Sequence, residues 1–131
     1  LGGAVASGAL ALPLLKLMFD RPRPDFLWHL VTEKDWSFPS GHAMGSMILY
    51  PLLGAIAGST RGRARSCWLA GLGMLVALTI GASRVVLGVH WISDVIGGWL
   101  IGLAWLCAVG AIARPQRSKA RDSDRLRGRA V

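Results

Sequence analysis

The sequence predicts an all-α protein, a polytopic bundle of four transmembrane helices, and two observations support this fold class. First, 53% of the 131 residues are hydrophobic, and the mean hydropathy is +0.46. Second, the apolar residues are gathered into blocks that are nearly free of charge instead of being scattered along the chain. These blocks are Leu1–Leu15, Ala43–Ser59, Cys67–Ala82 and Val95–Ala113.

Each block can be extended by a few residues to the length of a membrane span. About 18 residues at a rise of 1.5 Å form a helix of about 27 Å, close to the thickness of the bilayer core. Buried helices of a soluble bundle are the alternative. They usually carry a polar stripe at the helical period, which these blocks lack.

The first block begins at Leu1 without the basic region and cleavage site of a signal peptide. We therefore expect the chain to be a fragment of a longer protein.

The net charge of +8 is distributed unevenly along the chain. Three arginines separate the second and third blocks, and seven basic residues follow the fourth, so ten of the 15 basic residues lie on one predicted side of the membrane. They are Arg61, Arg63, Arg65, Arg114, Arg117, Lys119, Arg121, Arg125, Arg127 and Arg129. The positive-inside rule makes this side cytoplasmic and the opposite side external.

This pattern predicts two parts, a transmembrane domain over residues 1–113 and a basic cytoplasmic tail over residues 114–131. We expect the tail to be disordered and to lie near anionic lipid head groups, with no nucleic acid as a partner.

The predicted topology brings polar residues from distant parts of the chain to the outer side. The first helix reaches Lys16, a loop over residues 18–38 follows, and the second helix starts near Ser40. The third helix ends near Arg84, and the fourth begins near His90. Ionisable residues beside membrane spans indicate functional sites.

His90 and Asp94 lie four residues apart at the start of the fourth predicted helix, so they share a face. A carboxylate bonded to one ring nitrogen fixes the histidine tautomer and leaves the other nitrogen available as a nucleophile or base. A purely structural pair is the alternative for these two residues alone.

Pro39-Ser40-Gly41-His42 resembles the start of a helix, with Ser40 as its N-cap. Gly41 allows a ligand to approach the backbone, and free N–H groups at a helix N-terminus attract anions. Taken alone, the segment is equally consistent with an ordinary cap followed by an interfacial histidine.

Three cations, Lys16, Arg23 and Arg84, lie at the same side. Each could be an interfacial side chain that extends to water. Together with a hydroxyl, free amides and two histidines they suit a phosphate group, whose transfer requires stabilisation of negative charge. The carboxylates of the loop have no spacing that indicates Mg²⁺ ligation, so we predict no metal site and no cofactor.

These residues form three blocks with the patterns K-x6-R-P, P-S-G-H and S-R-x5-H-x3-D, eleven specified residues in order. The chain thereby resembles the type 2 phosphatidic acid phosphatase (PAP2) and vanadium haloperoxidase superfamily, in its membrane lipid phosphatase branch. Membrane members usually have about six helices, so the resemblance also implies that helices are missing from this fragment.

The resemblance implies a role for each matching residue. His90 would attack phosphorus, and Asp94 would orient the imidazole of His90. His42 would protonate the leaving oxygen and later activate water. The residues that would hold the phosphoryl oxygens are Lys16, Arg23, Ser40, Gly41 and Arg84. Arg21 matches no position of the signature and is expected to be a solvated loop cation.

The expected function is therefore metal-independent hydrolysis of a lipid phosphomonoester or diphosphate through a phosphohistidine. Candidate substrates are phosphatidic acid, phosphatidylglycerol phosphate and polyprenyl diphosphate, and the sequence does not distinguish them or indicate an oligomeric state. A phosphotransferase and a vanadium-dependent haloperoxidase are the alternatives, and the apolar blocks disfavour the second because haloperoxidases of this superfamily are soluble. We expect a multi-pass protein of the inner membrane, with its site on the outer, periplasmic face.

Overall fold

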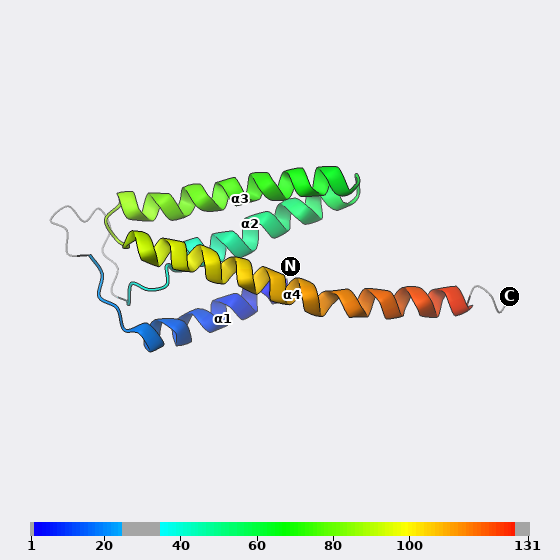
Figure 1. The fold of residues 1–131 in the computed structure, drawn as a ribbon, viewed down its shortest axis with the longest axis horizontal. Coiled ribbons are helices and arrows are strands. Elements are labelled where there is room, and N and C mark those ends of the chain that lie inside the picture. The colour runs from blue at the N-terminus through cyan, green and yellow to red at the C-terminus, as the bar shows by residue number, and fades with distance from the viewer. Residues whose placement is uncertain (1, 25–34, 128–131) are drawn as a thin grey trace.

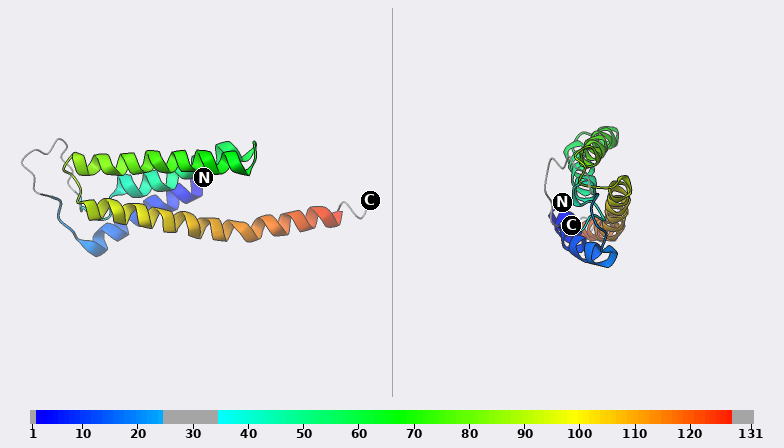
Figure 2. Two further views of the ribbon diagram at one scale, coloured as in Figure 1. Left: turned by 45° about the horizontal axis from the view of Figure 1, so that its top comes forward. Right: turned by 90° about the vertical axis from the view of Figure 1, so that its left-hand side faces the viewer.

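The computed structural model describes residues 2–24 and 35–127, with side-chain detail through residue 112. The described residues form four α-helices and no strand (Figure 1). They are α1 (Gly2–Phe19), α2 (Gly41–Ser59), α3 (Arg63–Val86) and α4 (Ile92–Arg127). The helices lie side by side along one direction, and α4 extends beyond the others (Figure 2). The predicted all-α class is confirmed.

Three of these helices are long and apolar enough to cross a membrane: α1, α3 and the Ile92–Ile112 part of α4. The remaining helix, α2, is 19 residues long and contacts all three of the others. Several of its side chains are buried, among them Met44, Met47 and Ile48. A helix enclosed by its neighbours meets less lipid, so its composition is less constrained to be apolar.

Large apolar side chains on the outer helices remain exposed. Leu75 on α3 is 59% exposed, and Leu100 on α4 is 66% exposed. In water such a surface would be a liability, whereas lipid tails are as apolar as the side chains that face them. The exposed residues therefore fit a bundle that is surrounded by a bilayer.

The closest helix pair is α2 with α3, where the backbones approach through glycine. A Cβ at Gly54 would lie 2.1 Å from the carbonyl oxygen of Leu69, and one at Gly73 would lie 2.3 Å from that of Tyr50. Gly54 and Gly58 are four residues apart, so they share a face of α2. Small residues at this spacing allow membrane helices to pack at short range.

The basic turn between α2 and α3 lies at the opposite end of the bundle from the α1–α2 and α3–α4 connections (Figure 1). Arg61, Arg63 and Arg65 are all exposed in this region. The ends of α1 and α3 and the starts of α2 and α4 therefore meet at one end, as the predicted topology requires.

Both ends of α4 differ from the predicted bounds. His90 lies in the turn before α4, because α4 begins at Ile92. At its other end the backbone is helical through Arg127, beyond the predicted end at Ala113, while the disorder of the basic tail over residues 114–131 stays a prediction. Alanine, lysine, arginine and leucine are strong helix formers, and the apolar part of α4 supplies the nucleus from which such a segment propagates.

We expect Gly54→Ala to lower the midpoint of thermal unfolding in detergent, because the added methyl overlaps the backbone of α3. Overpacking of this kind typically costs about 1–3 kcal/mol. Gly71→Ala on α3 is the matched control, since a Cβ there meets no atom within 4 Å. That change should leave stability unchanged or raise it, because alanine is the better helix former. Equal midpoints for the two variants would contradict the close α2–α3 packing.

Candidate active site

A cavity of about 280 Å³ opens where the helix ends converge. Three elements contribute to it: the last turns of α1, the segment that leads into α2 with its first turn, and the turn before α4. The residues that line it are Leu12, Lys16, Asp35, Gly41, His42 and His90. The cavity thus joins two histidines, a lysine and the start of a helix.

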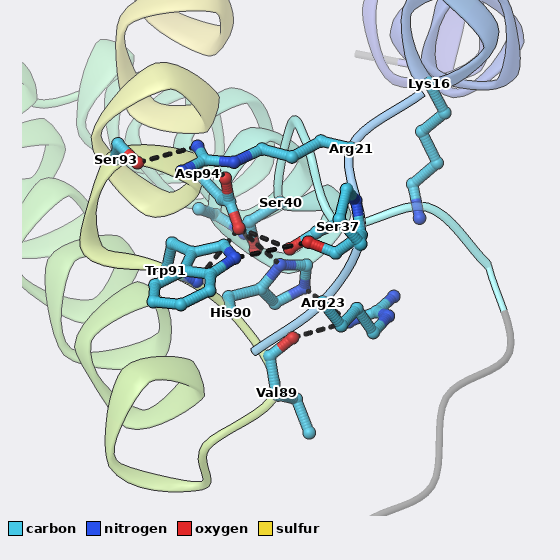
Figure 3. Close-up of polar contacts among 12 residues, drawn as sticks. Lys16, Arg21, Arg23, Ser37, Ser40, Val89, His90, Trp91, Ser93 and Asp94 are labelled. Atoms are coloured by element: carbon cyan, nitrogen blue, oxygen red, sulfur yellow. Dashed lines mark hydrogen bonds and ion pairs between the residues drawn. The ribbon is translucent and has the colours of Figure 1, made fainter. Parts of the chain in front are cut away.

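His90 is held by the tight turn that joins α3 to α4. Gly88 adopts a left-handed backbone conformation with φ of 72°, which glycine accepts without strain. The N–H of Val89 donates to the carbonyl of Arg84. His90 is 2% exposed, its Nδ1 lies 3.6 Å from Oδ2 of Asp94, and its Nε2 lies 3.3 Å from Nη1 of Arg23 (Figure 3). One ring nitrogen therefore faces a carboxylate and the other faces a cation.

Asp94 is fully buried in the first turn of α4. Its Oδ1 accepts a hydrogen bond from Nη1 of Arg21 at 2.7 Å. Its Oδ2 accepts from the hydroxyl of Ser37 and from the backbone N–H of Trp91, the latter at 2.9 Å. The carboxylate that faces His90 is therefore held by donors from three different positions in the chain.

The expectation that Arg21 is a solvated loop cation is wrong. Besides Asp94, its guanidinium donates to the hydroxyl of Ser93 at 2.8 Å and lies 5.7 Å from the centre of the Trp91 ring (Figure 3). Its side chain is 38% exposed. One signal was present in the sequence: residues two apart in an extended segment lie on the same side, and Arg23 is a motif residue. Ser37 was not predicted either.

Arg23 is fixed by backbone carbonyls. Its Nη1 donates to the carbonyl of Val89 and its Nε to the carbonyl of Asp35, both at 2.8 Å. Its Nη2 also forms an ion pair with the carboxylate of Asp35, whose second oxygen pairs with Nζ of Lys16. Partial burial raises the pKa of Asp35, but its hydrogen bonds to Lys16 and Arg23 and their charges outweigh this effect and lower the pKa below its usual value.

Ser40 is not among the residues that line the cavity. It is fully buried as the N-cap of α2, and its hydroxyl accepts from the N–H of Ala43 at 3.5 Å. Its own N–H donates to the carbonyl of Asp94 at 3.1 Å. A Cβ at Gly98 would lie 2.7 Å from the Ser40 carbonyl oxygen, so α4 approaches the start of α2 closely. These contacts join the two helix starts that carry the site.

The other predicted residues differ in their exposure. His42 is exposed in the first turn of α2 and lines the cavity with Gly41. Arg84 lies half-buried in the last turn of α3 and is not among the lining residues. The hydroxyl of Ser83 turns back to the carbonyl of Ile80 at 2.7 Å, so it supports the end of α3.

The structure therefore brings six of the eight predicted residues to the cavity or within reach of His90. Lys16, Gly41, His42 and His90 line it, while Arg23 and Asp94 are in reach of His90. Within the described ranges, no group of three or more His, Cys, Asp or Glu side chains is arranged to hold a metal ion. The cations of this site can bind an anionic substrate, and the buried imidazole with its carboxylate can act as the nucleophile that attacks it.

Comparisons with known proteins point to one family. The model of the PAP2 superfamily matches residues 1–117. The chain is 38% identical over 95 residues to phosphatidylglycerophosphatase B of Bacillus subtilis (strain 168). The aligned region covers 69% of this chain and 45% of that protein. It is 42% identical over 72 residues to undecaprenyl-diphosphatase of Sulfolobus acidocaldarius. This aligned region covers 55% of this chain and 31% of that protein.

A solved structure is also similar. The crystal structure of a transmembrane PAP2 type phosphatidylglycerolphosphate phosphatase from Bacillus subtilis aligns with a TM-score of 0.78 at 32% identity. The alignment covers 86% of this chain and 56% of that one. The chain therefore spans about half the length or less of the relatives that it matches.

We expect a double-mutant cycle of Arg21→Gln and Asp94→Asn to show a coupling energy of about 1 kcal/mol in thermal unfolding in detergent. A fully buried pair would give more, but the partly exposed Arg21 side chain is screened by solvent. The control cycle replaces Arg21→Gln with Arg63→Gln, a change at an exposed arginine of the basic turn. No coupling for Arg21, or the same coupling for Arg63, would contradict a specific Arg21–Asp94 ion pair.

Proposed function

The chain belongs to the PAP2 superfamily, and on this premise we propose that it carries the catalytic site of a membrane-embedded lipid phosphatase. The reaction is hydrolysis of a lipid phosphomonoester or diphosphate through a phosphohistidine. The observation that carries the proposal is the placement of His90, a buried imidazole in the wall of an open cavity, between a buried carboxylate and a cation.

In the first step, Nε2 of His90 attacks phosphorus, and the bond from phosphorus to the leaving oxygen breaks. Nδ1 faces Asp94, whose negative charge stabilises the imidazole as it becomes positive. Their separation of 3.6 Å is longer than a hydrogen bond, and catalytic contacts often shorten when substrate binds. His42, exposed to the cavity, donates a proton to the leaving oxygen.

In the second step, water attacks the phosphorus of the phosphohistidine, and the bond to Nε2 of His90 breaks. His42, now neutral, accepts a proton from this water, so the side chain that acted as an acid acts as a base. Inorganic phosphate leaves, and both histidines return to their starting states. The open cavity that His42 lines gives water a route to the site.

Charge on the phosphoryl oxygens is stabilised by cations and by the start of α2. We assign Lys16, Arg23 and the N–H of Gly41 to direct contact, because they line the cavity or adjoin His90. Ser40 and Arg84 are assigned from the family motif. Both lie next to contacts that hold the site, Ser40 at the N-cap of α2 and Arg84 at the start of the turn to His90.

An apolar groove between α1 and α2 supports a lipid as the substrate. It has a volume of about 110 Å³ and shares two lining residues, Leu12 and Gly41, with the site cavity. All of its lining residues are apolar: Val5, Gly8, Ala9, Leu12, Gly41, Met44, Gly45 and Ile48. The eight residues from Gly41 to Ile48 span about 10 Å along α2, seven rises of about 1.5 Å each. One lipid molecule could thus place its phosphate in the cavity and its apolar chain in the groove.

The two named relatives support the same substrate class, because phosphatidylglycerophosphate and undecaprenyl diphosphate are both phosphates on lipids. Phosphatidic acid, phosphatidylglycerol phosphate and a polyprenyl diphosphate are therefore the candidates. We place the site on the outer face of the inner membrane. The exposed arginines of the α2–α3 turn, at the far end of the bundle, support a cytoplasmic location for that end.

The direct test is phosphate release from these three substrates in detergent with EDTA, for the full chain and for His90→Ala. We expect the variant to lose at least about a thousandfold in rate, because the nucleophile is removed. EDTA should leave the rate unchanged, and a loss on chelation would indicate a metal. Release without dependence on His90 would contradict the mechanism. Consumption of substrate that depends on His90 without phosphate release would indicate transfer to another acceptor.

We expect Gly45→Leu to lower kcat/KM for dioleoyl phosphatidic acid relative to that for p-nitrophenyl phosphate by about tenfold. A Cβ at Gly45 meets no atom within 4 Å, and the rest of the leucine would fill the groove, which the lipid chain requires and p-nitrophenyl phosphate does not. Gly71→Leu on α3 adds the same bulk at another open position and should leave the ratio unchanged. An unchanged ratio for Gly45→Leu would show that the lipid chain lies elsewhere.

A further inference from the structure

We propose that the carboxylate of Asp35 occupies the phosphate subsite as an internal anion and that a substrate phosphate must displace it. Asp35 thereby determines how much negative charge a substrate needs to bind. The inference rests on the proposed function, because it takes Lys16 and Arg23 as the cations that receive phosphate. It concerns a residue outside the family motif.

The contacts of Asp35 resemble those of a bound phosphate. One carboxylate oxygen pairs with Nζ of Lys16, and the other pairs with Nη2 of Arg23. The same guanidinium approaches Nε2 of His90 through Nη1. Asp35 also lines the cavity together with His42 and His90. An anion that took its place would therefore lie beside the proposed nucleophile and within the proposed acid's cavity.

Exposure makes Asp35 a competitor that can be displaced. Its side chain is 57% exposed, whereas those of Lys16 and Arg23 are each 12% exposed. The two cations have lost much of their hydration and are costly to leave without an anion. Asp35 keeps most of its hydration, so its return to water costs little. A phosphate dianion brings a second negative charge and more acceptor oxygens than a carboxylate.

Arg23 does not need the Asp35 side chain to keep its position. Its Nε and Nη1 donate to the backbone carbonyls of Asp35 and Val89. These two hydrogen bonds do not involve the carboxylate, so they persist when it rotates away and keep the guanidinium in place to meet a phosphoryl oxygen. This distinguishes an internal anion from a residue that organises the cations.

Competition by Asp35 affects both the binding of substrate and the release of product. A substrate with a single negative charge competes poorly with Asp35, whereas a dianion displaces it. After hydrolysis, the carboxylate competes with inorganic phosphate for the same two cations and favours its release. Asp35 thus weakens phosphate binding and limits product inhibition.

The test measures the dissociation constants of inorganic phosphate and orthovanadate for the full chain in detergent at low ionic strength, by isothermal titration calorimetry. We expect Asp35→Asn to bind both anions about five- to tenfold more tightly, the effect of removing one charge near the site. Asp20→Asn is the matched control. It removes the same charge from an exposed residue of the same segment, and its φ of 44° is one that asparagine accepts. We expect its constants to stay within about twofold.

Weaker or unchanged binding by Asp35→Asn would overturn the proposal, because it would show that Asp35 organises the cations or does not compete. Equal tightening by Asp20→Asn would also overturn it, since net charge alone would then explain the effect. Failure of both wild type and Asp35→Asn to bind either anion would show that this is no phosphate subsite. Since binding needs no turnover, tighter binding without hydrolysis of any lipid phosphate would reject the phosphatase function alone.

Discussion

The buried carboxylate of Asp94 is the interaction on which the geometry of the site depends. A charge fully removed from solvent is costly unless donors surround it. Here the donors come from Arg21 after α1, Ser37 before α2 and the N–H of Trp91 before α4. The backbone carbonyl of Asp94 also accepts from Ser40 at the start of α2. One residue therefore joins three segments that are distant in sequence, and the imidazole of His90 lies against the carboxylate that they hold in place.

Close helix packing supplies the rigid frame behind these contacts. Glycines allow α2 to touch the backbone of α3 along its length, and Gly98 lets the start of α4 approach Ser40. The site residues on α2 and α4 are thus placed by direct backbone contacts, which cannot adjust by a change of side-chain rotamer. α1 is different, because it meets α2 across the apolar groove that continues from the site. It contributes Leu12 and Lys16 to the cavity, and the long side chain of Lys16 can reach the site without the same precision of the helix that carries it.

The fold class and the convergence of helix ends could be predicted because they follow from local patterns. Apolar blocks, the distribution of arginines and motif spacing are all visible along the chain. The partners of Asp94 could not be predicted, since Arg21 and Ser37 lie 73 and 57 residues away from it in sequence. The one indication was that Arg21 lies two residues before Arg23 in an extended segment, so the two side chains leave the backbone on the same side. Asp35 was missed for the same reason: its two cations are 19 and 12 residues away, and no periodicity connects them. The basic segment that continues α4 is helical through Arg127, which its pattern of charges alone did not indicate.

Two arginines separated by one proline serve two carboxylates of contrasting exposure. Arg21 pairs with Asp94, which is fully buried, and Arg23 pairs with Asp35, whose side chain is 57% exposed. Desolvation decides which of these pairs is permanent. Asp94 cannot leave its donors without stranding a charge in the interior, so its ion pair is part of the frame that holds His90. Asp35 can return to water at little cost, so its ion pair can exchange for another anion. The extended Arg21-Pro22-Arg23 segment thus places a fixed ion pair at the Nδ1 side of His90 and an exchangeable one at its Nε2 side, where a phosphate would bind.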